Sequence, residues 1–314
     1  MLLGTASHPG ELLEYRVSWA RCSVPPGEKP SFVLRTFERD GEPAALVLDA
    51  ESLVTRIVPL RGLTLTALEW KAMRKAVKGT PYGKALADCE KNANRRQDAG
   101  IVRGLPGARG VVLTVDLCPS TRPLDRGLFR AILQNFLAEE KPVPMGIAIT
   151  GRWMEEHPED LAWIRELEAA GEIAITWINH SYNHRYNKDL PLSRNFLLEA
   201  GTDPDVEVLG TEKAMIQRGL CPSAFFRFPG LVSDASLVRR IVAYGLIPVG
   251  SDAWLAKGQR ASSGSIVLLH GNGNEPVGIS DFLALLKREQ GAIRQKNWLL
   301  FDLRESVARE EEHK

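Results

Sequence analysis

Short apolar segments and helical patterns alternate along the last two thirds of the chain. The apolar, β-rich segments are 110–116, 143–150, 172–179, 223–229, 246–252, 265–270 and 297–303. Patterns with apolar residues three and four positions apart fall between most of them, at 124–138, 157–170, 206–218, 234–244 and 278–289. Strands that alternate with helices are typical of parallel sheets joined by right-handed crossovers. Residues 106–314 are therefore predicted to form a barrel or an open doubly wound sheet.

Residues 1–105 have a different pattern and are predicted to form a small α/β region before the main domain. Strand patterns occur at 31–37, at 44–50 and around Leu13, Tyr15, Val17 and Trp19. Amphipathic helical patterns occur at 64–77 and 83–96. We interpret the many Lys and Arg residues of these helices as a solvated face, with an anionic partner as the alternative.

Composition and charge narrow the class of protein. Of the 314 residues, 44% are apolar and 25% are charged, as in an ordinary globular protein. The net charge of +1 gives no support for nucleic-acid binding. No apolar run reaches the ~18–20 residues that span a bilayer, and residues 1–15 lack a signal-peptide core. The chain is expected in the cytoplasm, or in the periplasm or outside the cell if a signal peptide precedes residue 1.

The four cysteines are Cys22, Cys89, Cys118 and Cys221. None forms a C-x-x-C pair, which argues against a zinc ribbon or a thioredoxin-like site. We expect reduced, buried thiols, and a Cys22–Cys89 disulfide is the alternative for an exported chain.

Polar or ionisable residues stand at the ends of five predicted strands. They are Asp116, His180, Arg227, Asp252 and His270. Chemistry gathers at the carboxyl ends of the strands both in (β/α) barrels and in doubly wound sheets. These five side chains are therefore predicted to open onto one rim of the fold.

The spacing of His180 and His184 suggests a metal site. Imidazoles four residues apart can point the same way if the chain turns helically after the strand, and they suit zinc, cobalt, nickel or ferrous iron. A strand precedes His180 and Ser181 follows it, which argues against a zincin. Arg227 could orient a carboxylate, and His270 is placed to act as a general acid. A metal, a base and an acid together describe the hydrolysis of a carbonyl compound.

These segments resemble the motifs of the polysaccharide deacetylase family, also called NodB-homology or carbohydrate esterase family 4. The resemblance covers about residues 108–305, with the motifs in order. The matching segments are Thr114–Pro119, His180–His184 after Glu172-Ile173, Arg227–Pro229, Ser251–Trp254 and Leu268–His270.

The resemblance implies a distorted (β/α) barrel of about seven parallel strands. It implies a hydrolase that uses one divalent metal ion, zinc or else cobalt or nickel, to remove N- or O-acetyl groups from a carbohydrate. By motif position, Asp116 corresponds to the base, His180 and His184 to metal ligands, and His270 to the acid that protonates the leaving group.

Further positions follow from the same motifs. Arg227 and Asp252 are assigned catalytic roles. Gly230 would supply a backbone N–H to the oxyanion, and Trp254 and Tyr182 are candidate substrate-binding residues.

The first motif departs from the family pattern. Leu117 stands where the family has a metal-binding Asp, and Leu cannot bind a metal. Asp116 is therefore predicted to be the third metal ligand. The alternatives are two histidines with water, no metal, or the thiolate of Cys118, which we disfavour because the chain would have to bend to present it. The departure also leaves two other functions open: a glycan-binding barrel without catalysis, and a hydrolase of non-sugar amide bonds.

Overall fold

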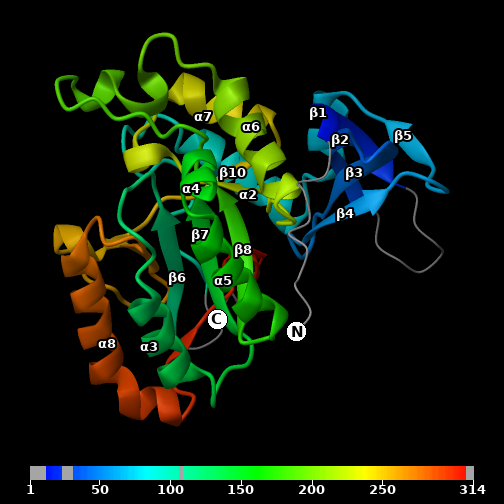
Figure 1. Ribbon diagram of the computed structural model, residues 1–314. Helices are drawn as coiled ribbons and strands as arrows, with labels where there is room; N and C mark the ends of the chain where they lie inside the picture. Colours follow the sequence, from blue (N-terminus) through cyan, green and yellow to red (C-terminus); the bar gives the residue numbers. More distant parts are fainter. Residues whose placement is uncertain (1–11, 23–30, 106–108, 309–314) are drawn as a thin grey trace.

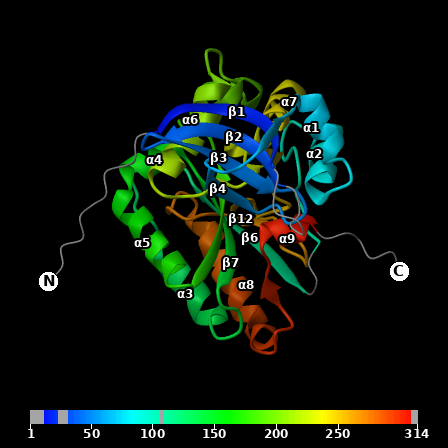
Figure 2. The same ribbon diagram turned by 90° about the vertical axis from the view of Figure 1, so that its right-hand side faces the viewer.

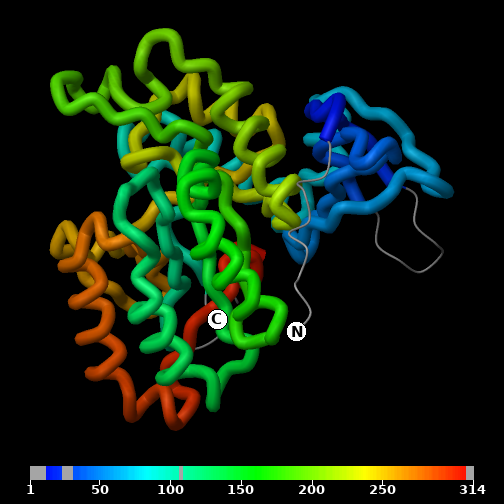
Figure 3. Tube along the Cα trace, in the orientation of Figure 1, coloured from blue at the N-terminus to red at the C-terminus, as the bar shows by residue number. Residues whose placement is uncertain are grey.

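A computed structural model describes residues 12–22, 31–105 and 109–308, which form an antiparallel N-terminal sheet and a larger parallel sheet (Figures 1 and 3). Seven parallel strands lie in the order β10-β9-β8-β7-β6-β12-β11, and β13 pairs with β6. The parallel sheet curls into a half-barrel flanked by helices, which confirms the predicted distorted (β/α) barrel. Among the described helices, none is both long enough and apolar enough to cross a membrane.

The parallel strands follow the predicted segments. Their bounds are β6 Gly110–Leu117, β7 Val143–Ile149, β8 Ile173–Asn179, β9 Phe225–Phe226, β10 Ile247–Pro248, β11 Ala253–Trp254, β12 Ile266–His270 and β13 Leu299–Leu300. The helices of this part are α3 Arg126–Phe136, α4 Gly151–Glu156, α5 Pro158–Ala169, α6 Pro204–Gln217, α7 Ala235–Ala243, α8 Pro276–Arg294 and α9 Leu303–Ala308.

Every residue of β6 is buried, as expected for a central parallel strand that is covered on both faces. The segments 223–229, 246–252 and 297–303, in contrast, contain only two strand residues each, where whole strands are predicted. Proline explains part of this difference, because it donates no backbone hydrogen bond. Pro222 and Pro229 flank β9, and Pro248 ends β10.

The N-terminal sheet has the strand order β4-β3-β2-β1-β5. Its strands are β1 Leu12–Cys22, β2 Ser31–Arg39, β3 Glu42–Asp49, β4 Thr55–Pro59 and β5 Leu65–Ala67, and the helices α1 Trp70–Ala76 and α2 Pro81–Lys91 follow. The predicted helix 64–77 is wrong in its first part. Leu65–Ala67 pair with Ala20–Cys22 of β1, and this tertiary pairing overrides the helical pattern.

A buried ion pair joins the N-terminal sheet to the barrel. Arg35 of β2 donates from Nε and Nη2 to the carboxylate of Glu212 on α6, at 2.7 and 2.9 Å, and both side chains are fully buried. Tyr15 of β1 donates to the same carboxylate. Figures 1 and 2 show the sheet beside one end of α6, which contacts β1.

The segment after α2 crosses to the barrel and fills the space between β10 and β12. Isolated bridges join Gln97 to Val232, Ile101 to Val249 and Arg103 to Ser265. The segment that precedes the barrel thus contributes to the barrel wall. Cys22 and Cys89 are buried thiols that no disulfide joins, and Cys221 is half-buried.

Candidate functional site

A cavity of about 550 Å³ lies at the carboxyl ends of the parallel strands. Its lining includes Asp116, Cys118, His180, His184, Trp254 and His270. Asp116 and His270 form the last residue pair between β6 and β12. His180 follows the last residue of β8. The strand-end rule therefore brings together most of the side chains that the sequence singles out.

The cysteine and two histidines of this cavity converge on one point. Sγ of Cys118 lies 3.5 Å from Nε2 of His180 and 3.5 Å from Nε2 of His184. All three donor atoms lie within 4.8 Å of one another. A tetrahedral zinc ion with bonds of about 2.3 Å to sulfur and about 2.05 Å to nitrogen would separate those ligands by about 3.5 Å. The donor set thus fits a borderline metal such as zinc.

The orientation of His180 also suits a metal ligand. Its Nδ1 lies 2.9 Å from the backbone oxygen of Arg227. A carbonyl oxygen can only accept, so Nδ1 carries the proton and Nε2 keeps its lone pair for a ligand bond. The spacing of the histidines had suggested a helical turn after β8, but the chain forms a loop there instead. Ser181 and His184 adopt positive φ values of 68° and 47°, and this loop brings the two rings together.

Cys118 is the donor that the sequence interpretation disfavoured. Side chains alternate along a strand, so Cys118 lies on the same face as Asp116, while Leu117 packs into the apolar core on the other face. Asn272 donates a 2.6 Å hydrogen bond to the carbonyl of Cys118 and holds the bend after β6. Cys118 lies one residue beyond β6, where the strand pattern no longer fixes the direction of a side chain.

Histidines surround the Cys118 thiol. Burial by itself raises the pKa of the thiol. The nearby His184, His270 and His180 lower the pKa by more than burial raises it, so it lies well below its ordinary value. The same thiolate, in turn, raises the pKa of His184 against the opposing effect of burial. A thiolate is the form of cysteine that binds metals.

Asp116 is the carboxylate that Arg227 holds. Nη1 of Arg227 lies 2.6 Å from Oδ1 of Asp116 and also donates to Thr114, and Nη2 donates to the carbonyl of Gly250. Arg227 is fully buried and lies behind the cavity rather than in its lining. The other oxygen of Asp116, Oδ2, lies 3.7 Å from Nε2 of His180.

His270 faces an acidic partner that the sequence did not reveal. Its Nδ1 lies 2.8 Å from Oε2 of Glu275. Burial by itself lowers the pKa of His270, but Cys118, Glu275 and Asp116 raise it well above its ordinary value. Trp254 donates from Nε1 to Glu275 at 2.7 Å, and the tryptophan therefore helps to fix this carboxylate. No signal in the sequence marks Glu275, because it lies in the loop between β12 and α8.

Aromatic residues form one side of the cavity. Phe196 lies edge-on to His184, with 5.6 Å between ring centroids, and stacks on Tyr186 at 5.3 Å. Gly230 also lines the cavity, with φ of 59°. A Cβ atom at this position would lie 2.5 Å from the Phe196 ring, so the close packing requires glycine.

Two residues predicted for the site lie elsewhere. The Asp252 carboxylate pairs with Arg103 at 2.6 Å and accepts a hydrogen bond from the backbone N–H of Ile266. Ile266 is the first residue of β12 and His270 is the last, so Asp252 lies at the opposite end of this strand from His270. The Tyr182 ring packs against Gly151 and Gly210, and its hydroxyl donates to Glu155. The prediction that all five strand-end side chains open onto one rim is therefore wrong for Asp252 and Arg227, and Tyr182 does not line the cavity. Arg103 holds the Asp252 carboxylate and Glu155 holds the Tyr182 hydroxyl outside the cavity.

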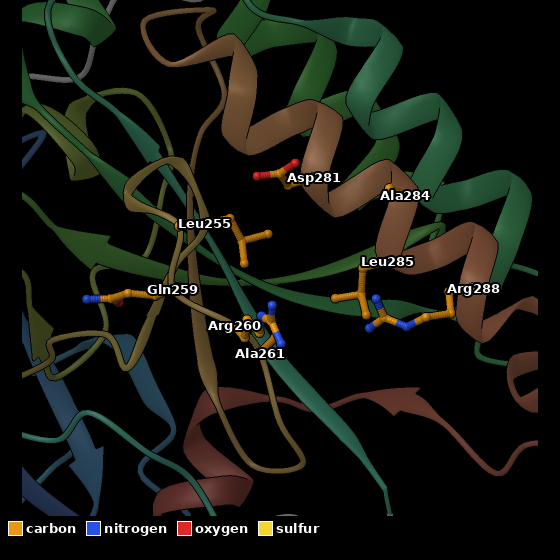
Figure 4. A pocket seen from close by; sticks show the side chains of 9 residues that line it. Leu255, Gln259, Arg260, Ala261, Asp281, Ala284, Leu285 and Arg288 are labelled. Carbon is orange, nitrogen blue, oxygen red and sulfur yellow. The ribbon is translucent and has the colours of Figure 1, made fainter.

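A separate cavity of about 540 Å³ lies between α8 and the loop after β11. Figure 4 shows Asp281 and Arg288 on the helix, with Arg260 on the facing loop. The described residues that line it include no His or Cys, and none of them lines the first cavity. The candidate chemistry thus belongs to the first cavity.

Comparisons with known proteins give weak likenesses. No family model matches the chain. A family 4 carbohydrate esterase from Streptomyces lividans, solved with acetate, is 22% identical over 61% of this chain and 91% of that one, with a TM-score of 0.42. A family 4 carbohydrate esterase from Bacillus anthracis is 17% identical over 73% and 92%, with a TM-score of 0.46.

A pseudoenzyme of the same esterase family, from Bacillus anthracis, is 16% identical over 66% of this chain and 68% of that one, with a TM-score of 0.44. Each of these is a likeness of fold between distantly similar chains. Family 4 carbohydrate esterases are thus among the solved structures that this chain resembles, as its motifs predict.

Proposed function

We propose that the chain is a metal-dependent hydrolase that removes acetyl groups from a carbohydrate. The observation that carries the proposal is the convergence of Cys118, His180 and His184 in a cavity that also holds Asp116 and His270. Three protein ligands with a free fourth position are typical of catalytic zinc sites. The motifs that resemble polysaccharide deacetylases support the choice of an acetylated carbohydrate.

Cys118, His180 and His184 would hold the ion. A divalent ion held there would polarise the acyl carbonyl and would lower the pKa of a water molecule. With Cys118 as the third donor, Asp116 remains available as the base that takes a proton from the attacking water. Arg227 holds Oδ1 of Asp116, which leaves Oδ2 for that proton.

His270 completes the reaction as the acid. Glu275 lies 2.8 Å from Nδ1, fixes the orientation of the ring and raises its pKa, which favours the protonated form that an acid needs. Nε2 can then donate a proton to the leaving nitrogen or oxygen of the sugar. Gly230 offers a backbone N–H for the developing oxyanion. Trp254 and the exposed Tyr186 offer aromatic faces to the sugar.

The test is the release of acetate by chain loaded with zinc, cobalt or nickel. The substrates are N-acetylated and O-acetylated oligosaccharides, and cyclic amides serve as the non-sugar comparison. We expect His270→Gln to retain the ion and to lose at least ~100-fold in kcat, within the range of general acid catalysis. The control is His157→Gln, because His157 bonds to the carbonyl of Ser120 and does not line the cavity.

Ring opening of the cyclic amides without acetate release from any oligosaccharide, or no reaction with any substrate, would refute the proposal. Oligosaccharide binding without release would instead indicate a glycan-binding barrel.

A thiol-dependent hydrolase is a second candidate. In this reaction Cys118 would be the nucleophile and His270 the base, and Glu275 would orient His270. This reaction would survive a chelator and would form an acyl-enzyme on Cys118, detectable as an added mass. Loss of activity with the chelator and recovery on adding zinc would favour the metal-dependent reaction.

A further inference from the structure

We infer that Glu207 is a positioning residue, which sets the loop between His180 and His184 in the conformation that brings the two imidazoles together. This inference rests on the proposed function, because it concerns how the metal ligands of that reaction are held. Glu207 lies in the first turn of α6, is only 3% exposed and does not line the cavity. None of the sequence motifs that resemble polysaccharide deacetylases includes it.

The Glu207 carboxylate accepts three hydrogen bonds from this loop. Oε2 accepts from the backbone N–H groups of Tyr182 and Asn183, at 2.9 and 2.8 Å. Oε1 accepts from the side-chain amide of Asn183, at 2.8 Å. Both oxygens of a carboxylate are acceptors, and charge-assisted hydrogen bonds are roughly twice as strong as neutral ones. One side chain of α6 thus fixes two consecutive peptide units between the metal ligands.

The backbone of this loop requires support. Ser181 and His184 lie in the left-handed region, with φ of 68° and 47°, which residues with a Cβ atom adopt only at a conformational cost. Conformations of this kind persist where the surrounding structure holds them in place. Without such contacts the loop would relax and the two imidazoles would separate.

Two helices supply the contacts. At the start of α4, the backbone N–H of Gly151 donates to the carbonyl of Ser181 at 3.2 Å. The next N–H, of Arg152, donates to the carbonyl of Tyr182 at 3.0 Å. The helix α4 thus holds carbonyl groups of the loop, and Glu207 holds its N–H groups. Of these two supports, only that of Glu207 comes from a side chain, so a substitution can remove it.

A role confined to α6 would not explain why Glu207 is buried. Acidic residues in the first turn stabilise a helix through its dipole, and Asp205 in the same turn can do this while half-exposed. Burial of a carboxylate, in contrast, costs solvation free energy that hydrogen bonds must offset. For Glu207 the donors that offset this cost are amides of the metal-ligand loop.

The experiment combines zinc affinity with hydrogen exchange of the loop, both measured on the full chain. Competition with a chromophoric chelator gives the affinity, and exchange of the segment 180–184 is followed in the metal-free chain. We expect Glu207→Ala to weaken zinc binding by ~10–100-fold, the usual effect of losing a residue that supports metal ligands. Exchange of the segment should become faster in the same variant, because two backbone N–H groups lose their acceptor.

Two controls lie on the same helix. Glu212→Gln removes another buried carboxylate, whose partners Arg35 and Tyr15 belong to the N-terminal sheet. It should destabilise the fold and retain the zinc affinity of the wild type. Asp205→Asn removes an exposed charge from the same turn as Glu207 and should change neither measurement.

An exchange of donor and acceptor separates positioning from a general loss of stability. Asn183→Asp places a second carboxylate against Glu207, so zinc affinity should fall and exchange of the loop should become faster. Adding Glu207→Gln restores the pair in reverse, because the Gln amide can donate to the new carboxylate while its oxygen accepts from the backbone. The double variant should regain at least ~10-fold in zinc affinity over Asn183→Asp alone.

The positioning role and the proposed reaction can fail separately. Wild-type zinc affinity in Glu207→Ala, equal losses in Glu207→Ala and Glu212→Gln, or no gain in the double variant would overturn the inference and leave the reaction intact. Absence of zinc binding in the wild type would refute the metal-dependent reaction. Exchange in the metal-free chain would then decide the role of Glu207: faster exchange of 180–184 in Glu207→Ala but not in Asp205→Asn would support it, and unchanged exchange would overturn it.

Discussion

The sulfur of Cys118 lies 3.5 Å from Nε2 of His184, the separation of two ligands on one tetrahedral zinc ion. His180 lies at the same distance from this sulfur. The relationship suggests that a thiolate replaces the carboxylate that Leu117 cannot supply. It changes the expected role of Asp116, which the sequence alone had favoured as the third ligand.

The first prediction concerns the ligand set. We expect Cys118→Ser to weaken zinc affinity by at least ~100-fold, since even residues that only support ligands contribute about 10–100-fold. His184→Ala should do the same, and Asp116→Asn should retain the ion. Elemental analysis measures the ion, and the thiolate-to-cobalt absorption band of the cobalt form reports the sulfur bond directly.

Cys118→Asp provides the matched comparison, because it restores a carboxylate. It should bind cobalt without the thiolate band. Metal lost from Asp116→Asn but retained in Cys118→Ser would return Asp116 to the ligand position.

The second prediction concerns the buried pair of Arg227 and Asp116. Arg227→Ala leaves the carboxylate buried without its partner, so the free energy of unfolding should fall by about 3–5 kcal/mol. Arg227→Met combined with Asp116→Asn removes both charges and should recover part of the loss. Denaturant titration with a chelator present measures both. Arg152→Ala, which breaks the exposed pair with Glu156, should cost less than about 1 kcal/mol.

The third prediction concerns Glu140, which accepts from the backbone N–H of Leu300 and helps to place β13. Burial raises the pKa of Glu140 from 4.5 to about 7, although the Leu300 N–H opposes this rise. The folded state therefore holds a proton that the unfolded state releases between these values. The stability that the protonated group contributes is present below pH 4.5 and is lost as the pH rises through about 7.

Glu140→Gln keeps the neutral form at every pH. Relative to the wild type, its free energy of unfolding should rise between pH 4.5 and 8, by roughly 1 kcal/mol after allowance for partial exposure. Glu139→Gln controls for the loss of a neighbouring carboxylate. A difference between Glu140→Gln and the wild type that stays constant with pH would contradict the expectation.

The fourth prediction concerns the junction between the N-terminal sheet and the barrel. Glu212→Ala leaves the Arg35 guanidinium buried and unpaired, so we expect a loss of about 3–5 kcal/mol and faster proteolysis of the N-terminal sheet. Asp205→Ala is the control on the same helix. Its pair with Arg240 is half-exposed and should contribute less than about 1 kcal/mol. Equal effects of the two substitutions would argue against the buried pair as the main tie.

The sequence by itself determined the architecture and most of the candidate site. Strand and helix patterns alternate, and local patterns of this kind require parallel strands with crossovers. The ends of parallel strands meet on one rim, so Asp116, His180 and His270 could be placed together from their positions alone. The contact of Arg227 with Asp116 follows the same reasoning.

Only the tertiary structure decided which neighbouring residues face the cavity. Cys118 points inward because the chain bends after β6, and the hydrogen bond from Asn272 that holds this bend comes from a distant loop. Asp252 turns away because Arg103, from the segment before the barrel, binds its carboxylate. Glu275 and Gln97 reach the cavity from loops that have no periodic pattern. Periodicity assigns faces within a strand, but the direction of a side chain beyond the strand depends on long-range contacts that local patterns do not contain.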